Sequence, residues 1–232
     1  MNLEIKSEKV FKKLLCIIIA LVLLNILGLI SKYYFDHDYV YGLVPLFDLD
    51  TEKNIPTFYS AVAILCSSFL LFFIAVTHKK NGNLYLAWFG LGLIFLFLSI
   101  DEISSLHERL IKPVRENLGT SGLLFSAWVI PYGLALILFV AGYLKFLLQL
   151  PKKIMYLFCI SGAVFVAGAI GLELFEGHHY ERHGSIDLTF AIFYTVEEFL
   201  EMFGIVLFIY TLLAYIETEF GPLKITVDQD DV

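Results

Sequence analysis

The chain has 232 residues, a formal net charge of −7 at pH 7, and 59% hydrophobic residues. Its apolar residues gather in six runs, each of which reaches or approaches the roughly 20 residues needed to cross a bilayer. This pattern excludes a soluble globular domain, and we expect no nucleic-acid partner. It predicts an all-α, polytopic membrane protein built as a six-transmembrane-helix bundle.

The predicted spans, in chain order, are about 14–31, 57–77, 84–101, 123–147, 154–176 and 188–215. Because the connections are short, we expect residues 1–215 to form a single transmembrane bundle and residues 216–232 to form a cytoplasmic tail. Lys and Arg concentrate in the cytoplasmic segments of membrane proteins. With the N-terminus inside, 10 of the 16 Lys and Arg lie on the cytoplasmic side. Both termini are therefore predicted to be cytoplasmic, in a multi-pass protein of the plasma (inner) membrane.

Acidic residues are distributed the opposite way. With this topology, 16 of the 23 Asp and Glu lie outside the membrane or in the outer halves of the spans. Acidic residues contribute little to membrane orientation, so topology does not explain this distribution. We therefore expect carboxylates to have a function at the outer, periplasmic side.

The first outer connection, residues 32–56, combines acids with four tyrosines and two phenylalanines. The aromatic residues favour an anchor at the membrane interface. The alternative is a lid that supplies Asp36, His37 or Asp38 to a site below it. Its segment FDLDTEKN begins like a calcium loop, but Lys53 stands where such a loop needs glycine, so we expect no calcium site there.

The third predicted span ends in LFLSIDEISSLHERL, which carries Asp101, Glu102 and His107. Glu102 and His107 are five residues apart, so they share one ion only if the helix bends or ends between them. Arginines and lysines follow this segment and the fifth span, and they could neutralise the acids as ion pairs without a metal. These cations are Arg109, Lys112, Arg115 and Arg182.

The fifth predicted span ends in GLELFEGHH, where Glu173, Glu176 and His179 recur at three-residue intervals along a helix face. Ala163, Ala167 and Gly171 form a small-residue stripe just before them. Such stripes let helices approach closely. We expect the carboxylates of a neighbouring helix to come near Glu173.

The sixth predicted span contains FYTVEEFLEMFG, in which Tyr194, Glu197, Glu198 and Glu201 share one helical stripe. Glu198 lies about ten residues into this span, or roughly 15 Å at 1.5 Å per residue. An ionised side chain near the centre of a span costs about 2.5–3.5 kcal/mol. These glutamates therefore either bind protons or face cations inside the bundle.

Carboxylates and imidazoles that converge in a helical bundle are typical of metal sites with one or two ions. The ferritin-like plan takes Glu from two helices and Glu-x-x-His from two others; only Glu176 and His179 reproduce such an element, and the residues identify no family. Mixed Glu and His ligands favour Fe, Zn or Mn. The predicted metal ligands are Glu102, Glu173, Glu176, His179, Glu198 and Glu201.

The function predicted from this pattern is that of a metal-dependent membrane oxidoreductase or hydrolase with its pocket at the outer leaflet. Tyr194 and His107 are the expected catalytic residues, as proton donors or acceptors. The expected partners are membrane lipid and a lipid, quinone or other apolar substrate, with a homo-oligomer or a larger membrane complex as a further expectation. The alternatives are a cation or proton transporter or channel that uses the same carboxylates, and an accessory subunit of a membrane complex.

Overall fold

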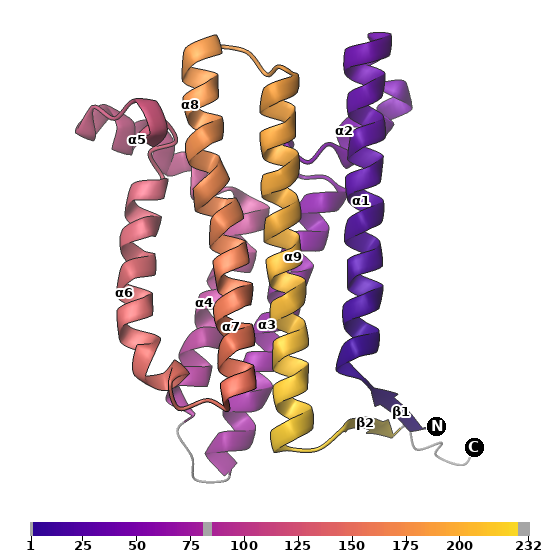
Figure 1. Cartoon of the computed structure of the whole chain (residues 1–232), viewed down its shortest axis with the longest axis vertical. Helices are drawn as coiled ribbons and strands as arrows, with labels where there is room; N and C mark the ends of the chain where they lie inside the picture. The colour runs from indigo at the N-terminus through magenta and orange to yellow at the C-terminus, as the bar shows by residue number, and fades with distance from the viewer. Residues whose placement is uncertain (1, 81–84, 227–232) are drawn as a thin grey trace.

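The computed structural model describes residues 2–80 and 85–226, and it is predominantly helical (Figure 1). Six helical stretches are long and apolar enough to cross a membrane. They are α1 (Ser7–Phe35), α3 (Ile55–Lys80), α4 (Leu86–Ser104), α6 (Val129–Leu147), the continuous stretch Lys152–His183, and α9 (Leu188–Glu219). The prediction of a helical chain with six helices able to span a membrane is confirmed.

Shorter elements connect these helices. They are η1 (Val40–Gly42) and α2 (Leu43–Phe47) after α1; α5 (Glu108–Leu118) and η2 (Gly122–Leu124) after α4; and α7 (Lys152–Val166), the π-helical η3 (Ala167–Leu172) and α8 (Glu173–His183), which together make the fifth stretch. Near the chain ends, β1 (Asn2–Ile5) pairs antiparallel with β2 (Leu223–Thr226). Residues 227–232 of the predicted tail lie outside the described residues.

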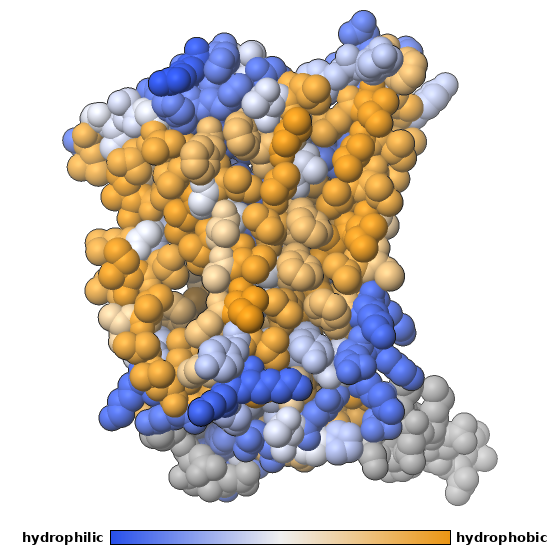
Figure 2. All heavy atoms as spheres, in the orientation of Figure 1, coloured by the Kyte–Doolittle hydropathy of each residue, from blue (hydrophilic) through white to orange (hydrophobic). Residues whose placement is uncertain are grey.

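Helix α9 is the centre of the bundle. It contacts α1, α3, α7 and α8, and its apolar residues are buried on several sides, including Met202, Val206 and Leu212. The outer helices instead turn many large apolar side chains outward. Figure 2 shows these side chains as a hydrophobic belt between two hydrophilic ends. A belt of this kind matches the hydrocarbon core of a bilayer.

An apolar core fills the end of the bundle near β1 and β2. Leu71, Trp88, Phe158 and Leu212 belong to one buried cluster that joins α3, α4, α7 and α9. The α3–α4 pair is also held by hydroxyls: Ser68 donates to the carbonyl of Gly92 at 2.8 Å, and a second such bond links α4 back to α3. Interhelical hydrogen bonds of this type stabilise packing where water is absent.

Helix α6 packs least tightly of the spanning helices. Within it only Val129 is buried, and α6 stands at the edge of the bundle (Figure 1). Leu134, Ile137, Leu138 and Leu144 are exposed. This face is open to lipid or to another membrane protein.

Two glycines allow α9 to approach the fifth stretch closely. A Cβ atom on Gly204 would lie 2.8 Å from the backbone nitrogen of Phe165, and one on Gly168 would lie 2.8 Å from the carbonyl oxygen of Glu197. Both neighbours are backbone atoms, which cannot rotate away. A Cβ on the predicted contact residue Gly171 would meet only its own helix, at 3.9 Å from the carbonyl of Val166. The close approach therefore uses Gly168 and Gly204.

We expect Gly204→Ala to destabilise the protein by about 1–3 kcal/mol, because the added methyl group overpacks the α7–α9 contact. This loss exceeds the gain of about 0.5–1 kcal/mol that alanine brings to a helix. The matched control is Gly162→Ala in α7, where a Cβ meets nothing within 4 Å. The measurement is reversible unfolding in mixed micelles, followed by circular dichroism. Equal stability of the two variants would contradict the tight contact.

Candidate metal centre

Helix α8 and the first part of α9 lie at the end of the bundle opposite β1 and β2 (Figure 1). Glu173 and Glu176 of α8 and Glu197 of α9 each place one carboxylate oxygen within 4.8 Å of the other two. Protein oxygens bind divalent ions at about 2.0–2.6 Å, so ligands of one ion lie up to roughly 5 Å apart. The spacing of these oxygens fits a metal site. We call these residues the three-glutamate group.

The backbone just before Glu173 departs from the α-helix. Ala167–Leu172 forms one π-helical segment, η3, between α7 and α8. A π-helical turn rotates the following residues relative to the preceding helix, and such turns are frequent at functional sites. In this chain the turn sets which face of α8 carries Glu173 and Glu176 toward α9.

Glycines on two faces of the fifth stretch bring the acids together. Gly168 lets η3 approach α9 at the level of Glu197. On another face, a Cβ on Gly177 would collide with Ser126, whose backbone nitrogen would lie only 3.1 Å away. Helix α8 is thus held between α9 and the segment that leads into α6. This packing forces the three carboxylates into one small space against their mutual repulsion.

The group contains oxygens that have no hydrogen-bond partner. Glu197 is only 7% exposed, and its Oε2 atom and the Oε2 atom of Glu176 are buried and unpartnered. Within residues 2–80 and 85–226, no Lys or Arg forms an ion pair with these acids; the pairs found there are Lys112–Glu116 and two that involve histidine. An unpaired buried polar group costs about 1–3 kcal/mol, and more if it is charged. The group therefore requires a proton or a cation.

The other predicted carboxylate ligands lie around the three-glutamate group. Glu201 is close enough to Glu102 and Glu173 to repel them, and Glu198 interacts in the same way with Glu201 and Glu102. All three of Glu102, Glu198 and Glu201 are half-buried. The structure therefore brings acids from α4, α8 and α9 into one region, with three of them forming its compact centre.

His107 stands next to this region in a fixed orientation. Its Nδ1 atom lies 3.3 Å from Oδ1 of Asp101, and its backbone N–H donates to the same oxygen at 2.9 Å. The hydroxyl of Tyr132 donates to the other oxygen of Asp101 at 2.8 Å. Burial disfavours the charged imidazole, but the carboxylates of Asp101, Glu108 and Glu102 outweigh it and raise the pKa of His107 above its ordinary value.

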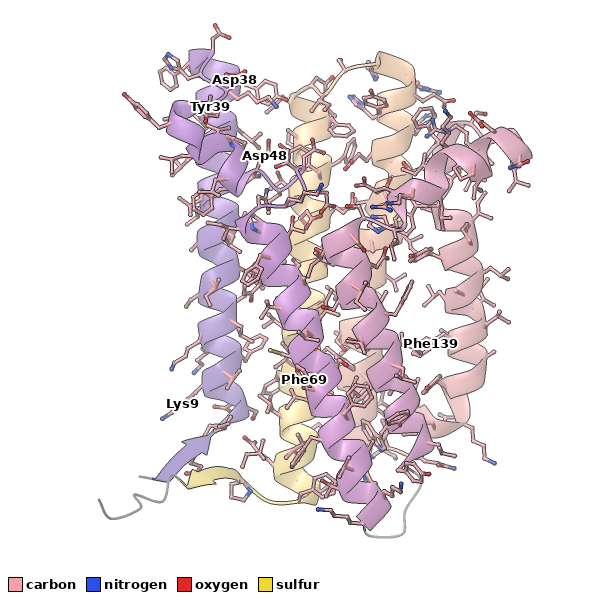
Figure 3. The ribbon with its side chains drawn as sticks, turned by 180° about the vertical axis from the view of Figure 1, so that it is seen from behind. Lys9, Asp38, Tyr39, Asp48, Phe69 and Phe139 are labelled. Atoms are coloured by element: carbon pink, nitrogen blue, oxygen red, sulfur yellow. The ribbon has the colours of Figure 1, made fainter. Side chains whose placement is uncertain are left out.

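The connection between α1 and α3 also contributes acids. Figure 3 shows Asp48 at the end of the bundle opposite Lys9. Burial, followed by the nearby charge of Asp48, raises the pKa of Asp50 to about 6, and burial together with Glu108 raises the pKa of Glu52. Asp50 also interacts with Glu173. Residues 48–52 thus approach the acidic region, with Asp48 buried and Glu52 exposed. Asp36, His37 and Asp38 are all exposed.

Two predicted site residues, His179 and Tyr194, are not members of the three-glutamate group. Nε2 of His179 lies 2.9 Å from Oδ1 of Asp187, and the same oxygen accepts the backbone N–H of Phe190 at the start of α9. His179 is not part of the three-glutamate group. Tyr194 is 3% exposed, its hydroxyl has no hydrogen-bond partner, and Asp48 acts on it electrostatically. The roles assigned to both residues stay predictions.

Glu197, Asp50 and Glu52 are absent from the predicted ligand set. The sequence offered a signal for Glu197, because it shares the helical stripe of Glu198 and Glu201. Asp50 and Glu52 alternate with other residues in FDLDTEKN, a segment judged only as a calcium loop. Their approach to α4 and α8 depends on how the connection folds back, which spacing along the chain does not reveal.

Asn25 fixes this connection to the bundle. It is 2% exposed, its amide donates to the hydroxyl of Thr195 at 2.9 Å, and its oxygen accepts the backbone N–H of Leu49 at 3.1 Å. One side chain of α1 therefore joins α9 to the acidic end of the connection. Its amide supplies both the donor and the acceptor that this position needs.

We expect Asn25→Ala to destabilise the protein by about 1–3 kcal/mol, because it leaves the N–H of Leu49 buried without an acceptor. The connection should also loosen, so trypsin should cut faster at the exposed Lys53. Thermal unfolding and limited proteolysis measure the two effects. Asn117→Ala, at an exposed position of α5, is the control and should change neither. An unchanged cleavage rate in Asn25→Ala would contradict this role.

Residues 14–216 match a protein-family model whose description is "Domain of unknown function (DUF8692)". No curated protein and no solved structure matches the chain.

Proposed function

We propose that this chain, which belongs to the DUF8692 family of domains of unknown function, is an integral membrane metalloprotein with a carboxylate-rich centre in the outer half of its bundle. Its proposed activity class is that of a metal-dependent membrane enzyme. One observation carries the proposal: the oxygens of Glu173, Glu176 and Glu197 lie within 4.8 Å of one another, in a region where two buried carboxylate oxygens have no partner.

A divalent cation explains this arrangement better than protons alone. A shared proton can join two carboxyl groups, and Glu197 is placed to share one with Glu173 or Glu176, but one proton joins only two oxygens at a time. A cation uses several carboxylates at once and turns their repulsion into shared coordination. The close packing at Gly168 and Gly177 keeps the acids together. The proposed ion would bind between the carboxylates that this packing holds together.

The metal that suits mixed Glu and His ligands is Fe, Zn or Mn. Such an ion would act as a Lewis acid or would activate water, and iron could also support oxidation. The reaction class is therefore that of an oxidoreductase or a hydrolase. His107, with its position fixed by Asp101, and Tyr194, with its unpartnered hydroxyl, are the proposed proton donors or acceptors.

The surroundings of the site favour an apolar substrate. Glu197 is the tenth residue of α9, which places it roughly 14 Å from the start of that helix at 1.5 Å per residue. A molecule that reaches this depth from the side must travel through lipid. A membrane lipid, a quinone or another apolar molecule meets this requirement, and the loosely packed α6 lies at the edge of the bundle where such a molecule would enter.

The alternative of a cation or proton transporter or channel needs polar groups along a complete path. Below the acidic region, Leu71, Trp88 and Leu212 belong to an apolar cluster. The hydroxyls of Ser67 and Thr211 in this half donate to backbone carbonyls of their own helices. This packing favours a site open to one side.

The exposed face of α6 fits lipid, a second copy of the chain in a homo-oligomer, or a larger membrane complex. An accessory subunit of a membrane complex stays the third alternative.

We also propose that the acidic end faces outward, toward the periplasm, with both termini in the cytoplasm of a plasma (inner) membrane protein. The support is the separation of charge along the bundle. Lys9 and Asp48 lie at opposite ends (Figure 3), and Lys-rich segments favour the cytoplasmic side.

Metal binding tests the proposed function directly. We expect the chelator-treated protein in detergent to bind Mn(II), Zn(II) or Fe(II) on dialysis. Glu197→Gln should weaken binding at least tenfold, because it replaces a ligand charge at the centre of the group. Glu116→Gln, at an exposed position on α5, is the matched control and should bind like the wild type. The readout is metal content by elemental analysis. Absence of bound metal in the wild type would refute the proposed function.

Orientation is tested with single cysteines. Cys16, Cys66 and Cys159 are first replaced by serine. Asn117→Cys should then react with a membrane-impermeant maleimide on intact cells, because the acidic end is expected outside. Lys152→Cys, at the opposite end, should react only after the membrane is opened. The reverse pattern would invert the proposed topology.

A further inference from the structure

The three-glutamate group offers only oxygen ligands, whereas Fe, Zn and Mn sites commonly include nitrogen. The sequence predicts His179 as the nitrogen ligand. Its Nε2 atom is 2.9 Å from Asp187, and its ring stacks on that of His183 with centroids 4.2 Å apart. These contacts engage the Nε2 atom and one ring face of His179 at the junction of α8 and α9. His178 of α8 has a buried, unpartnered Nδ1 atom that lies near Gly122 of η2. His107 is the histidine on which the carboxylates of Asp101, Glu102 and Glu108 act.

His107 has the geometry of a metal-binding imidazole. Asp101 is 4% exposed and receives the hydroxyl of Tyr132, so it is a fixed partner for Nδ1 of His107. The ring also packs against Trp128, with centroids 4.8 Å apart. Metal-binding histidines usually direct one ring nitrogen to a carboxylate, which fixes the tautomer and leaves the other nitrogen for the metal. In the described part of the chain, no hydrogen bond engages Nε2 of His107.

The imidazole lies among acids from several elements. Glu102 at the end of α4 acts on it electrostatically, and the imidazole in turn acts on Glu52 of the first connection and on Glu173 of α8. Glu173 belongs to the three-glutamate group as well. Glu173 is therefore near enough to interact both with His107 and with the other two members of the group.

We infer that His107 and Glu102 bind a second divalent ion beside the three-glutamate group, with Nε2 of His107 as its nitrogen ligand and Glu173 between the two ions. The inference rests on the proposed function. Charge supports it, because one divalent ion brings two positive charges to a region that contains six carboxylates and no paired Lys or Arg among the described residues. These carboxylates belong to Glu102, Glu173, Glu176, Glu197, Glu198 and Glu201. The buried, unpartnered Oε2 atom of Glu197 points to a cation in the same region.

A purely structural role for the His107–Asp101 pair is the competing explanation. Helix α4 ends at Ser104, Ser105 adopts a left-handed conformation with φ of 48°, and Asp101 accepts the N–H of His107 just beyond. These contacts close the end of the helix. A loss of stability in a variant would therefore not distinguish the two roles, whereas direct detection of nitrogen bound to the metal does.

The experiment uses the full chain in detergent, stripped with a chelator and dialysed against Mn(II). We expect the wild type to bind two equivalents and to show 14N modulation from an imidazole in pulsed electron paramagnetic resonance. His107→Gln should bind one equivalent and lose the modulation, whereas His179→Gln should keep both. Asp101→Asn should keep the modulation but weaken the second equivalent about 10- to 100-fold, which is typical when the carboxylate partner of a ligating histidine is changed.

The outcomes separate this inference from the proposed function. A single equivalent of Mn(II) without 14N modulation in the wild type overturns the second ion and leaves the three-glutamate site intact. Modulation that persists in His107→Gln also overturns it, and loss of modulation in His179→Gln alone assigns the nitrogen to His179. If the wild type binds no Mn(II), Zn(II) or Fe(II), the proposed function and this inference both fail.

Discussion

The constraint on which the rest of the structure depends is the cost of keeping carboxylates apart from water and from positive charge. Glu176 and Glu197 each keep a buried oxygen without a partner, inside a helical bundle with an apolar belt. In such surroundings an isolated charge is far less stable than in water. The fold nevertheless gathers these residues from separate helices. Its packing can be understood as the means of holding them together.

That packing acts from several directions. Gly168 and Gly177 remove side-chain volume where α8 must lie close to α9 and to Ser126. Asn25 holds the acidic connection over the same end of the bundle. At the other end, the apolar cluster of α3, α4, α7 and α9 supplies the favourable burial that offsets the repulsion. Most of the stabilising contacts are therefore remote from the acids, and the local geometry of the site depends on them.

The helices were predictable because long apolar runs have few other structures available in a membrane. The convergence of acids from α4, α8 and α9 also followed from the alternation of spans. The detail did not. The π-helical η3 changes which small residue faces α9, so Gly168 and not Gly171 makes the contact. His179 sits close enough to the start of α9 to meet Asp187. Such differences arise from tertiary packing, which a single helical periodicity cannot encode.

The position of α9 has a consequence for biosynthesis. Of the helices described, α9 is synthesised after the others, yet α1, α3, α7 and α8 all pack on it, and β1 pairs with β2, which follows α9. A nascent chain in which only the first five of these helical stretches have been made lacks α9, and therefore also lacks Glu197. The packing of the described helices is therefore completed only after α9 has been made, and an intermediate that carries Glu173 and Glu176 precedes it.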